Sequence, residues 1–143
     1  MSWVVDTCLL IDILEDDPAF GKQSATLLDE MMPDGLVLCP VTYTELAPAF
    51  LGDGRRQRDF LDAIGVVYTC AWTWEDTQRA HKAWHRHIHL RRQQKTIKRP
   101  VADILIGAFA QGHQGLLTRN ADDFRTVFPD LRITTPQKEP RRL

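Results

Sequence analysis

The sequence predicts an α/β fold in which helices cover both faces of a parallel β-sheet. The clearest sign is the apolar run at residues 3–5, which is too short for a helix and has no polar alternation. Strands of this kind are buried on both faces, as in parallel sheets. Further short apolar runs follow, separated by segments of helical pattern, at residues 36–41, 66–68 and 116–118.

Length and composition indicate a single domain. A chain of 143 residues can bury about 70% of its unfolded surface. We expect the domain to span residues 1–136, with a flexible basic tail at residues 137–143. The three cysteines are odd in number and widely spaced, which is typical of reduced thiols. Since no apolar run approaches the roughly 20 residues of a membrane span, we expect a cytoplasmic protein that crosses no membrane.

Positive charge is concentrated in one segment, although the net charge is only −1. This segment contains no acid, whereas the rest of the chain has ten Lys or Arg against nineteen Asp or Glu. Such a stretch is typical of proteins that bind a phosphate backbone, and equally of solvated helix faces. Its members are Arg79, Lys82, Arg86, Arg91, Arg92, Lys95, Lys98 and Arg99.

The first half of the chain is expected to form helices around two strands. Asp6 or Thr7 would cap a helix at about residues 8–14. Asp17-Pro18 would start a second helix that ends near Met32. A strand is expected to follow at residues 36–41.

Glu45 has a purely structural explanation in the sequence. Thr42 has the character of a helix cap, and Glu45 three residues later fits a capping box, in which the carboxylate accepts a bond from the cap N–H. Pro48 is expected to disturb this helix one turn further on.

The second half is expected to form a helix at residues 55–64, an edge strand at 66–68 and a long helix that starts near Glu75 and Asp76. Residues 91–99 are expected to be a basic connector. Pro100 would start a helix that is apolar nearly all round and therefore buried. Strands are expected at 116–118 and, at the edge of the sheet, near Ile133.

Three histidines recur every fourth residue of the long helix: His81, His85 and His89. Such a row can bind a transition metal. No acid or cysteine stands beside it, and the surrounding positive charge would repel a dication. We therefore interpret the row as a solvated or RNA-facing edge.

Four acids occupy equivalent places in this scheme. Asp6 follows the first strand, Glu45 follows the second, Asp103 opens the buried helix, and Asp123 or its neighbour Asp122 follows a later strand. Each has a capping explanation of its own. Together they are expected to converge, because the carboxyl ends of parallel strands meet at one edge of the sheet, where ligands bind.

Converging carboxylates require protons or a cation. Two of them about 4 Å apart repel by roughly 4 kcal/mol at a surface-like dielectric. Hard oxygen ligands favour Mg²⁺ or Mn²⁺. A cation held in this way is suited to phosphodiester hydrolysis, since it activates water and offsets charge on the phosphate.

Four motifs resemble those of the PIN-domain ribonucleases, and more closely the VapC-type toxins of type II toxin–antitoxin pairs. The motifs are residues 4–12 around Asp6, 40–45 ending in Glu45, 100–108 around Asp103, and 117–124, which contains Asn120 and Asp123. No single motif is specific, but their order and spacing are. The resemblance extends from Val4 to about Ile133.

The resemblance implies a three-layer α/β/α fold with a five-stranded parallel sheet and a Mg²⁺- or Mn²⁺-dependent endoribonuclease. It implies that Asp6, Glu45, Asp103 and Asp123 form the acidic quartet, with Asn120 as a further direct or water-mediated ligand. Thr7 would hold the scissile phosphate or a ligand water. It also implies homodimers and a cognate antitoxin that covers the site.

For the RNA backbone, we predict contacts from the basic residues Arg86, Arg92, Lys98 and Arg99 and from Arg119 beside the fourth acid. One alternative is a catalytically silent RNA-binding module that uses only the basic helix at residues 77–99. Another is a phosphotransferase with Asp6 as nucleophile, similar to haloacid-dehalogenase-like enzymes. That alternative is disfavoured because Cys8 stands where a second Asp is expected.

Overall fold

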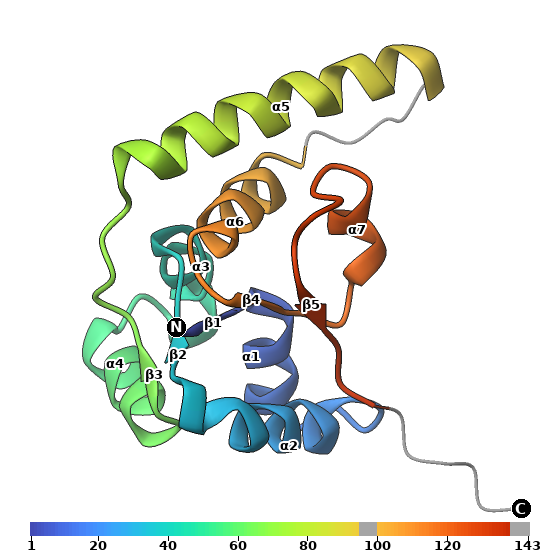
Figure 1. Ribbon diagram of the computed structural model, residues 1–143. Coiled ribbons are helices and arrows are strands. Elements are labelled where there is room, and N and C mark those ends of the chain that lie inside the picture. The colour runs from blue at the N-terminus through green and yellow to red at the C-terminus, as the bar shows by residue number, and fades with distance from the viewer. Residues whose placement is uncertain (95–99, 138–143) are drawn as a thin grey trace, which may run out of the picture.

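The sheet of the protein is parallel throughout. The computed structural model describes residues 1–94 and 100–137, and for residues 92–94 it describes the backbone alone (Figure 1). In this part of the chain, the strand order is β3-β2-β1-β4-β5. Their bounds are β1 (Trp3–Val5), β2 (Leu36–Val37), β3 (Val66–Val67), β4 (Gly115–Leu117) and β5 (Ile133–Thr134). The predicted α/β class, the parallel sheet and its five strands are confirmed.

Side-chain alternation along the strands produces two cores. Val4 is paired with Val37 and Leu116 in the strand register, and these three face one core. Val5 and its register partner Leu117 face the other core. Because successive residues of a strand point to opposite faces, a central strand of three apolar residues fills both. This explains why the run at residues 3–5 has no polar residue.

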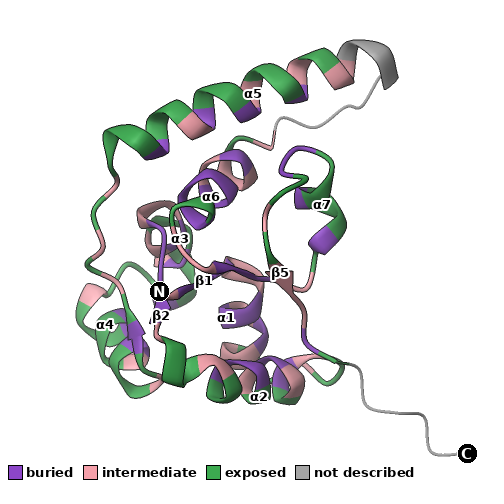
Figure 2. Ribbon diagram, in the orientation of Figure 1, coloured by how far each residue is buried: buried purple, intermediate pink, exposed green. Residues whose placement is uncertain are grey.

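Helices form a layer on each face of the sheet, and their inner sides are buried (Figure 2). One core is covered by residues from α1 (Thr7–Leu14), α2 (Gly21–Met31) and α4 (Gly54–Ala63). The other is covered by residues from α5 (Trp74–Gln94), α6 (Val101–Gln111) and α7 (Ala121–Arg125). The short helices η1 (Met32–Asp34), α3 (Pro40–Glu45) and η2 (Ala47–Phe50) complete the chain. The architecture is therefore the expected three-layer α/β/α arrangement.

Two predicted helix starts were misplaced. The side chain of Asp17 caps a turn, accepting bonds from the N–H groups of Ala19 and Phe20, and α2 begins only at Gly21. The second strand ends at Val37, and α3 begins at Pro40 rather than after Thr42. Proline needs no N–H partner at a first helical position, which explains the early start.

The predicted capping box at Glu45 was wrong. Thr42 lies inside α3 and is fully buried, and Glu45 is the last residue of that helix. Pro48 does not disturb α3, because the helix has already ended and Pro48 lies in the first turn of η2. The structural explanation for Glu45 is thereby removed.

Helix α5 extends to Gln94, so residues 91–94 are helical rather than part of a connector. The rest of the predicted connector lies outside the described residues, as do Lys98 and Arg99, the side chain of Arg92 and the end of the predicted tail. Within the described ranges, no helix is both long enough and apolar enough to cross a membrane.

Helix α6 packs tightly because Gly107 has no side chain. A Cβ added there would lie 2.3 Å from Phe128 Cε2. We expect Gly107→Ala to lower the free energy of unfolding by about 1–3 kcal/mol, since a well-packed core cannot absorb an added methyl group. Urea denaturation measures this, with Gly54→Ala in α4 as control, where the nearest added contact is the flexible end of Arg58. Equal effects of the two substitutions would contradict the packing argument.

Candidate active site

The strand order reverses between β1 and β4, and the candidate site lies at the carboxyl ends of these two strands. From β1, the chain builds β2 and β3 on one side and later returns to place β4 on the other. Such switch points leave a crevice in which ligands bind. Asp6 follows β1 directly and Thr118 follows β4, and Thr118 Oγ1 donates a hydrogen bond of 2.7 Å to Asp6 Oδ2.

Asp6 is held in one orientation by several donors, although only 6% of it is exposed. The N–H of Thr7 donates to Oδ1 at 2.8 Å, so Asp6 is also the cap of α1, as one interpretation of the sequence expected. Cys8 Sγ lies 3.5 Å from Oδ2. Burial raises the pKa of Asp6, the three hydrogen bonds lower it, and the negative charge of Glu45 raises it again. The net pKa is raised.

Glu45 is brought to the start of α1 by a side-chain bond. Thr7 Oγ1 donates to Glu45 Oε1 at 2.7 Å and lies 3.2 Å from Thr42 Oγ1. Glu45 itself is exposed. The first two acidic motifs of the sequence are therefore joined through Thr7, whose hydroxyl orients a carboxylate in this structure.

Asp103 lies in the first turn of α6, and the charges of the other three acids affect its pKa. Its pKa is raised from 3.8 to about 6, first by burial and then by the negative charges of Asp6, Asp123 and Glu45. Among the described residues, the charges that act on this carboxyl are all negative. The structure thus brings Asp6, Glu45 and Asp123 within electrostatic range of Asp103.

The four acids do not yet form a closed ligand set. Over the described ranges, no group of three or more His, Cys, Asp or Glu side chains is arranged so that it could hold a metal ion as it stands. Their chemistry nevertheless suits a hard cation, because all the donors are carboxylate oxygens and their negative charges repel one another.

The sequence matches the family model of the PIN domain over residues 3–128. The chain belongs to the PIN domain family. A search of curated protein sequences finds no match.

Several solved structures of toxin–antitoxin complexes contain chains with a similar fold. One is VapBC2 from Rickettsia felis bound to a promoter DNA fragment (14% identity, TM-score 0.69, covering 96% of this chain and 100% of that one). Another is VapBC-1 from nontypeable Haemophilus influenzae (20% identity, TM-score 0.69, covering 94% of this chain and 98% of that one). A third is a toxin–antitoxin complex from Klebsiella pneumoniae (23% identity, TM-score 0.61, covering 95% of this chain and 98% of that one). At these identities, the likeness establishes a shared fold.

The structure separates the two adjacent acids of the fourth PIN motif. Asp123 is exposed at the start of α7, and its charge acts on Asp103. Asp122 instead lies 3.4 Å from Arg125, and its side chain is 98% exposed. Asn120 is exposed, and its backbone N–H donates to Thr118 Oγ1 at 3.1 Å. Asp123 is therefore the member of the pair whose charge acts on Asp103.

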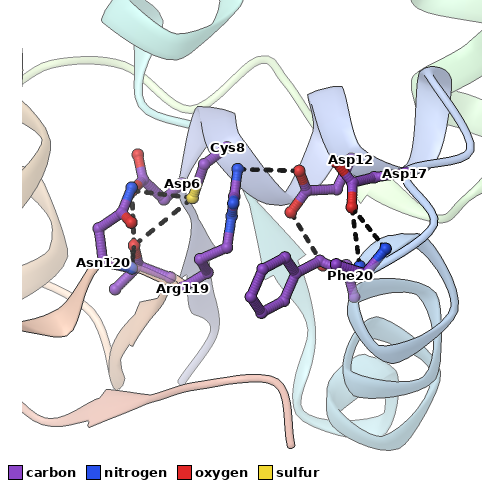
Figure 3. A network of polar contacts seen from close by, with 10 residues as sticks. Asp6, Cys8, Asp12, Asp17, Phe20, Arg119 and Asn120 are labelled. Carbon is purple, nitrogen blue, oxygen red and sulfur yellow. Dashed lines mark hydrogen bonds and ion pairs between the residues drawn. The ribbon is translucent and has the colours of Figure 1, made fainter. Parts of the chain in front are cut away.

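Arg119 is paired with a buried carboxylate, and its role in substrate binding stays a prediction. Its Nη2 lies 3.0 Å from Oδ1 of the buried Asp12 on α1, and its guanidinium lies 4.7 Å from the ring centre of Phe20 (Figure 3). Ser24 on α2 donates a 3.4 Å bond to the same carboxylate. Arg119 thus anchors the loop before α7 to the opposite helical layer.

Arg86 is likewise bound within the fold. Its Nη1 donates a 3.0 Å bond to the carbonyl of Val127, beyond the end of α7. The predicted contacts Arg92, Lys98 and Arg99 lie outside the described side chains. His81, His85 and His89 are exposed on α5.

Sequence reasoning missed Thr118 and Cys8 as neighbours of Asp6. A signal for Thr118 was present, since it is the polar residue that ends an apolar strand run, as Asp6 is. The parallel register pairs Val5 with Leu117, which brings the two following residues together. Burial and the charge of Asp6 raise the pKa of Cys8 to about 11, so its thiol is protonated and acts as a weak donor.

We expect Arg119→Met to lower the free energy of unfolding by about 2–4 kcal/mol, because it leaves the buried Asp12 carboxylate without its cationic partner. The cost is below that of a fully buried pair, since the Arg119 side chain is 32% exposed. The double variant Asp12→Leu/Arg119→Met should recover most of the loss. Urea denaturation measures both. A double variant less stable than Arg119→Met would contradict this account of the pair.

The raised pKa of Asp103 predicts a pH-dependent stability. The folded chain binds this proton more tightly than the unfolded chain does, so the contribution to stability is full below about pH 4 and is lost as the pH rises through about 6. In metal-free buffer, wild type should lose about 1–2 kcal/mol relative to Asp103→Asn over this window, after allowance for partial exposure. Chemical denaturation at a series of pH values measures the difference, and a constant difference would refute the prediction.

Proposed function

We propose that this PIN domain is a Mg²⁺- or Mn²⁺-dependent endoribonuclease that forms the toxin half of a toxin–antitoxin pair. One observation carries the proposal: a half-buried carboxyl, Asp103, has its pKa raised by burial and by the charges of three other acids that come from separate elements of the fold. Gathering these negative charges costs electrostatic repulsion. A cation that all four acids share would relieve it.

Asp6 and Asp103 are the residues we assign to hold the metal, with Glu45 and Asp123 as further ligands and Asn120 as a direct or water-mediated one. When bound, the cation would supply activation of water and neutralisation of charge at the scissile phosphate. Glu45 and Asp123 are exposed, so their side chains can rotate to complete the ligand set.

The surrounding residues prepare the site for this role. Of the roughly four bonds that a carboxylate can accept, Asp6 uses three, from Thr7 N, Thr118 Oγ1 and Cys8 Sγ. One acceptor position therefore remains for a cation, with the carboxylate already oriented. Thr7 keeps Glu45 against α1 and, with Glu45 rotated toward a cation, has its hydroxyl available for a phosphate oxygen or a ligand water.

The proposed partners are RNA as substrate, a cognate antitoxin and a second copy of the chain, in the cytoplasm. The fold that this chain shares with members of several solved toxin–antitoxin complexes supports the antitoxin. The acid-free basic segment supports RNA.

We expect purified protein to cleave RNA with Mg²⁺ or Mn²⁺ and to stop when the metal is chelated. Asp6→Asn and Asp103→Asn should each lower the rate at least about 100-fold, because they remove a ligand charge without changing side-chain shape. Cleavage of total RNA, read out by sequencing of the new ends, measures this.

Asp122→Asn is the matched control for Asp123→Asn. The two carboxylates are adjacent in the chain, but only that of Asp123 acts on Asp103. Asp122→Asn should therefore leave cleavage close to wild type. If the protein bound RNA without metal and did not cleave it, this would refute the nuclease and support the catalytically silent RNA-binding module.

A further inference from the structure

A groove lined by three basic side chains lies away from the acids. It has a volume of about 270 Å³ and runs between α5, the end of α6 and the segment after α7. Arg79, Lys82 and Arg86 of α5 line it, opposite Gln111 and Pro129. Buried Ala83 and Phe128 also line it and provide its apolar base.

The three basic residues form a stripe on one side of α5. Their spacing of three and then four residues places them on one helical face. Like charges at such spacings destabilise a helix, and the Lys82 and Arg86 side chains carry this cost without an acidic neighbour on the helix. Asp130 is the acid among the lining residues. An anionic ligand would relieve the repulsion.

The two arginines are already oriented. Arg79 Nη1 is bound at 2.7 Å to Asp76 Oδ1, and the other oxygen of this buried carboxylate accepts from the N–H of Thr73. Arg86 Nη1 is bound to the carbonyl of Val127 at 3.0 Å. A guanidinium has five N–H donors, so each arginine can donate further hydrogen bonds besides the one described. Its planar arrangement of donors matches the oxygens of a phosphate.

The groove lies where two helices from the acidic site end. Asp103 is in the first turn of α6, and Gln111 is the last residue of that helix, about 12 Å further along at 1.5 Å per residue. Asp123 is in the first turn of α7, and Val127 follows its end. The groove therefore lies at the opposite ends of these two helices from Asp103 and Asp123.

We propose that this groove binds the phosphate backbone of single-stranded RNA outside the cleavage site. The inference rests on the proposed nuclease function for its ligand, but it concerns a separate surface. Basic grooves that follow the backbone are the usual device for holding single strands without base recognition. The groove would hold a segment of the RNA strand that lies beyond the bond being cut.

The test is binding of a fluorescein-labelled oligouridylate of about 20 nucleotides to the full chain in EDTA, where cleavage cannot interfere. The groove variant is Lys82→Ser/Arg86→Gln, in which Gln keeps a donor for the Val127 carbonyl. The control is Lys22→Ser/Arg132→Gln, which removes the same charge from exposed residues outside the groove. Circular dichroism melts verify that both variants fold.

We expect the groove variant to bind at least about fivefold more weakly and the control to stay within about twofold of wild type. The slope of log K against log salt should fall by about 1.4 in the groove variant, since each lost phosphate contact on a single strand contributes about 0.7. Equal effects of groove and control variants would overturn the proposal. So would unchanged RNA binding with loss of binding to poly-glutamate, which would indicate an acidic protein partner.

The two proposals fail separately. Weaker RNA binding by the groove variant, together with no cleavage by wild type in Mg²⁺, would support the groove and refute the nuclease. Cleavage by wild type with equal binding by groove and control variants would overturn the groove alone.

Discussion

The repulsion among carboxylates at the carboxyl ends of β1 and β4 is the constraint on which the site depends. Asp6 is almost fully removed from water, and its charge, with those of Glu45 and Asp123, acts on Asp103. Charges in such a place are costly unless donors, protons or a cation compensate them. Thr118 and the N–H of Thr7 compensate Asp6 in part. The repulsion that remains among the carboxylates would be relieved by a bound cation.

The fold holds these charges in place from both sides of the sheet. Thr118 ties the end of β4 to Asp6, and Thr7 ties the start of α1 to Glu45. Arg119, one residue after Thr118, anchors the following loop to Asp12 on α1. The loop that carries Asn120 and leads to Asp123 is thus fixed at its start by two neighbouring residues. Thr118 binds Asp6 in the site, and Arg119 binds Asp12 in the helical layer.

Apolar pattern and strand position were enough to predict the fold and the grouping of the acids. Residues 3–5 indicated a strand buried on both faces, and the parallel register then brings the residues after each strand to one edge. The two cores confirm the reason, since Val4 and Val5 fill opposite ones. The fourth acid could not be chosen from the sequence, because Asp122 and Asp123 differ only in the direction that α7 gives them.

Other errors arose where a local rule competed with packing. Thr42 satisfies the rule for a helix cap, but Pro40 starts the helix earlier and turns Thr42 into the core. Arg119 stands beside the acids in sequence, but the structure pairs its charge with the buried carboxylate of Asp12 on α1. Partners of buried charges on distant helices are not encoded in any short motif, so this pairing required the structure.

The central claim is that the four acids share a divalent cation. Calorimetric titration of Mn²⁺ into metal-free wild type and Asp103→Asn at about pH 6 tests it most directly, with the same titration in two buffers of different ionisation enthalpy. We expect binding to wild type with release of protons, since a carboxyl of raised pKa must lose its proton to become a ligand, and little or no binding to Asp103→Asn. Equal binding to both proteins, or none to wild type, would contradict the account.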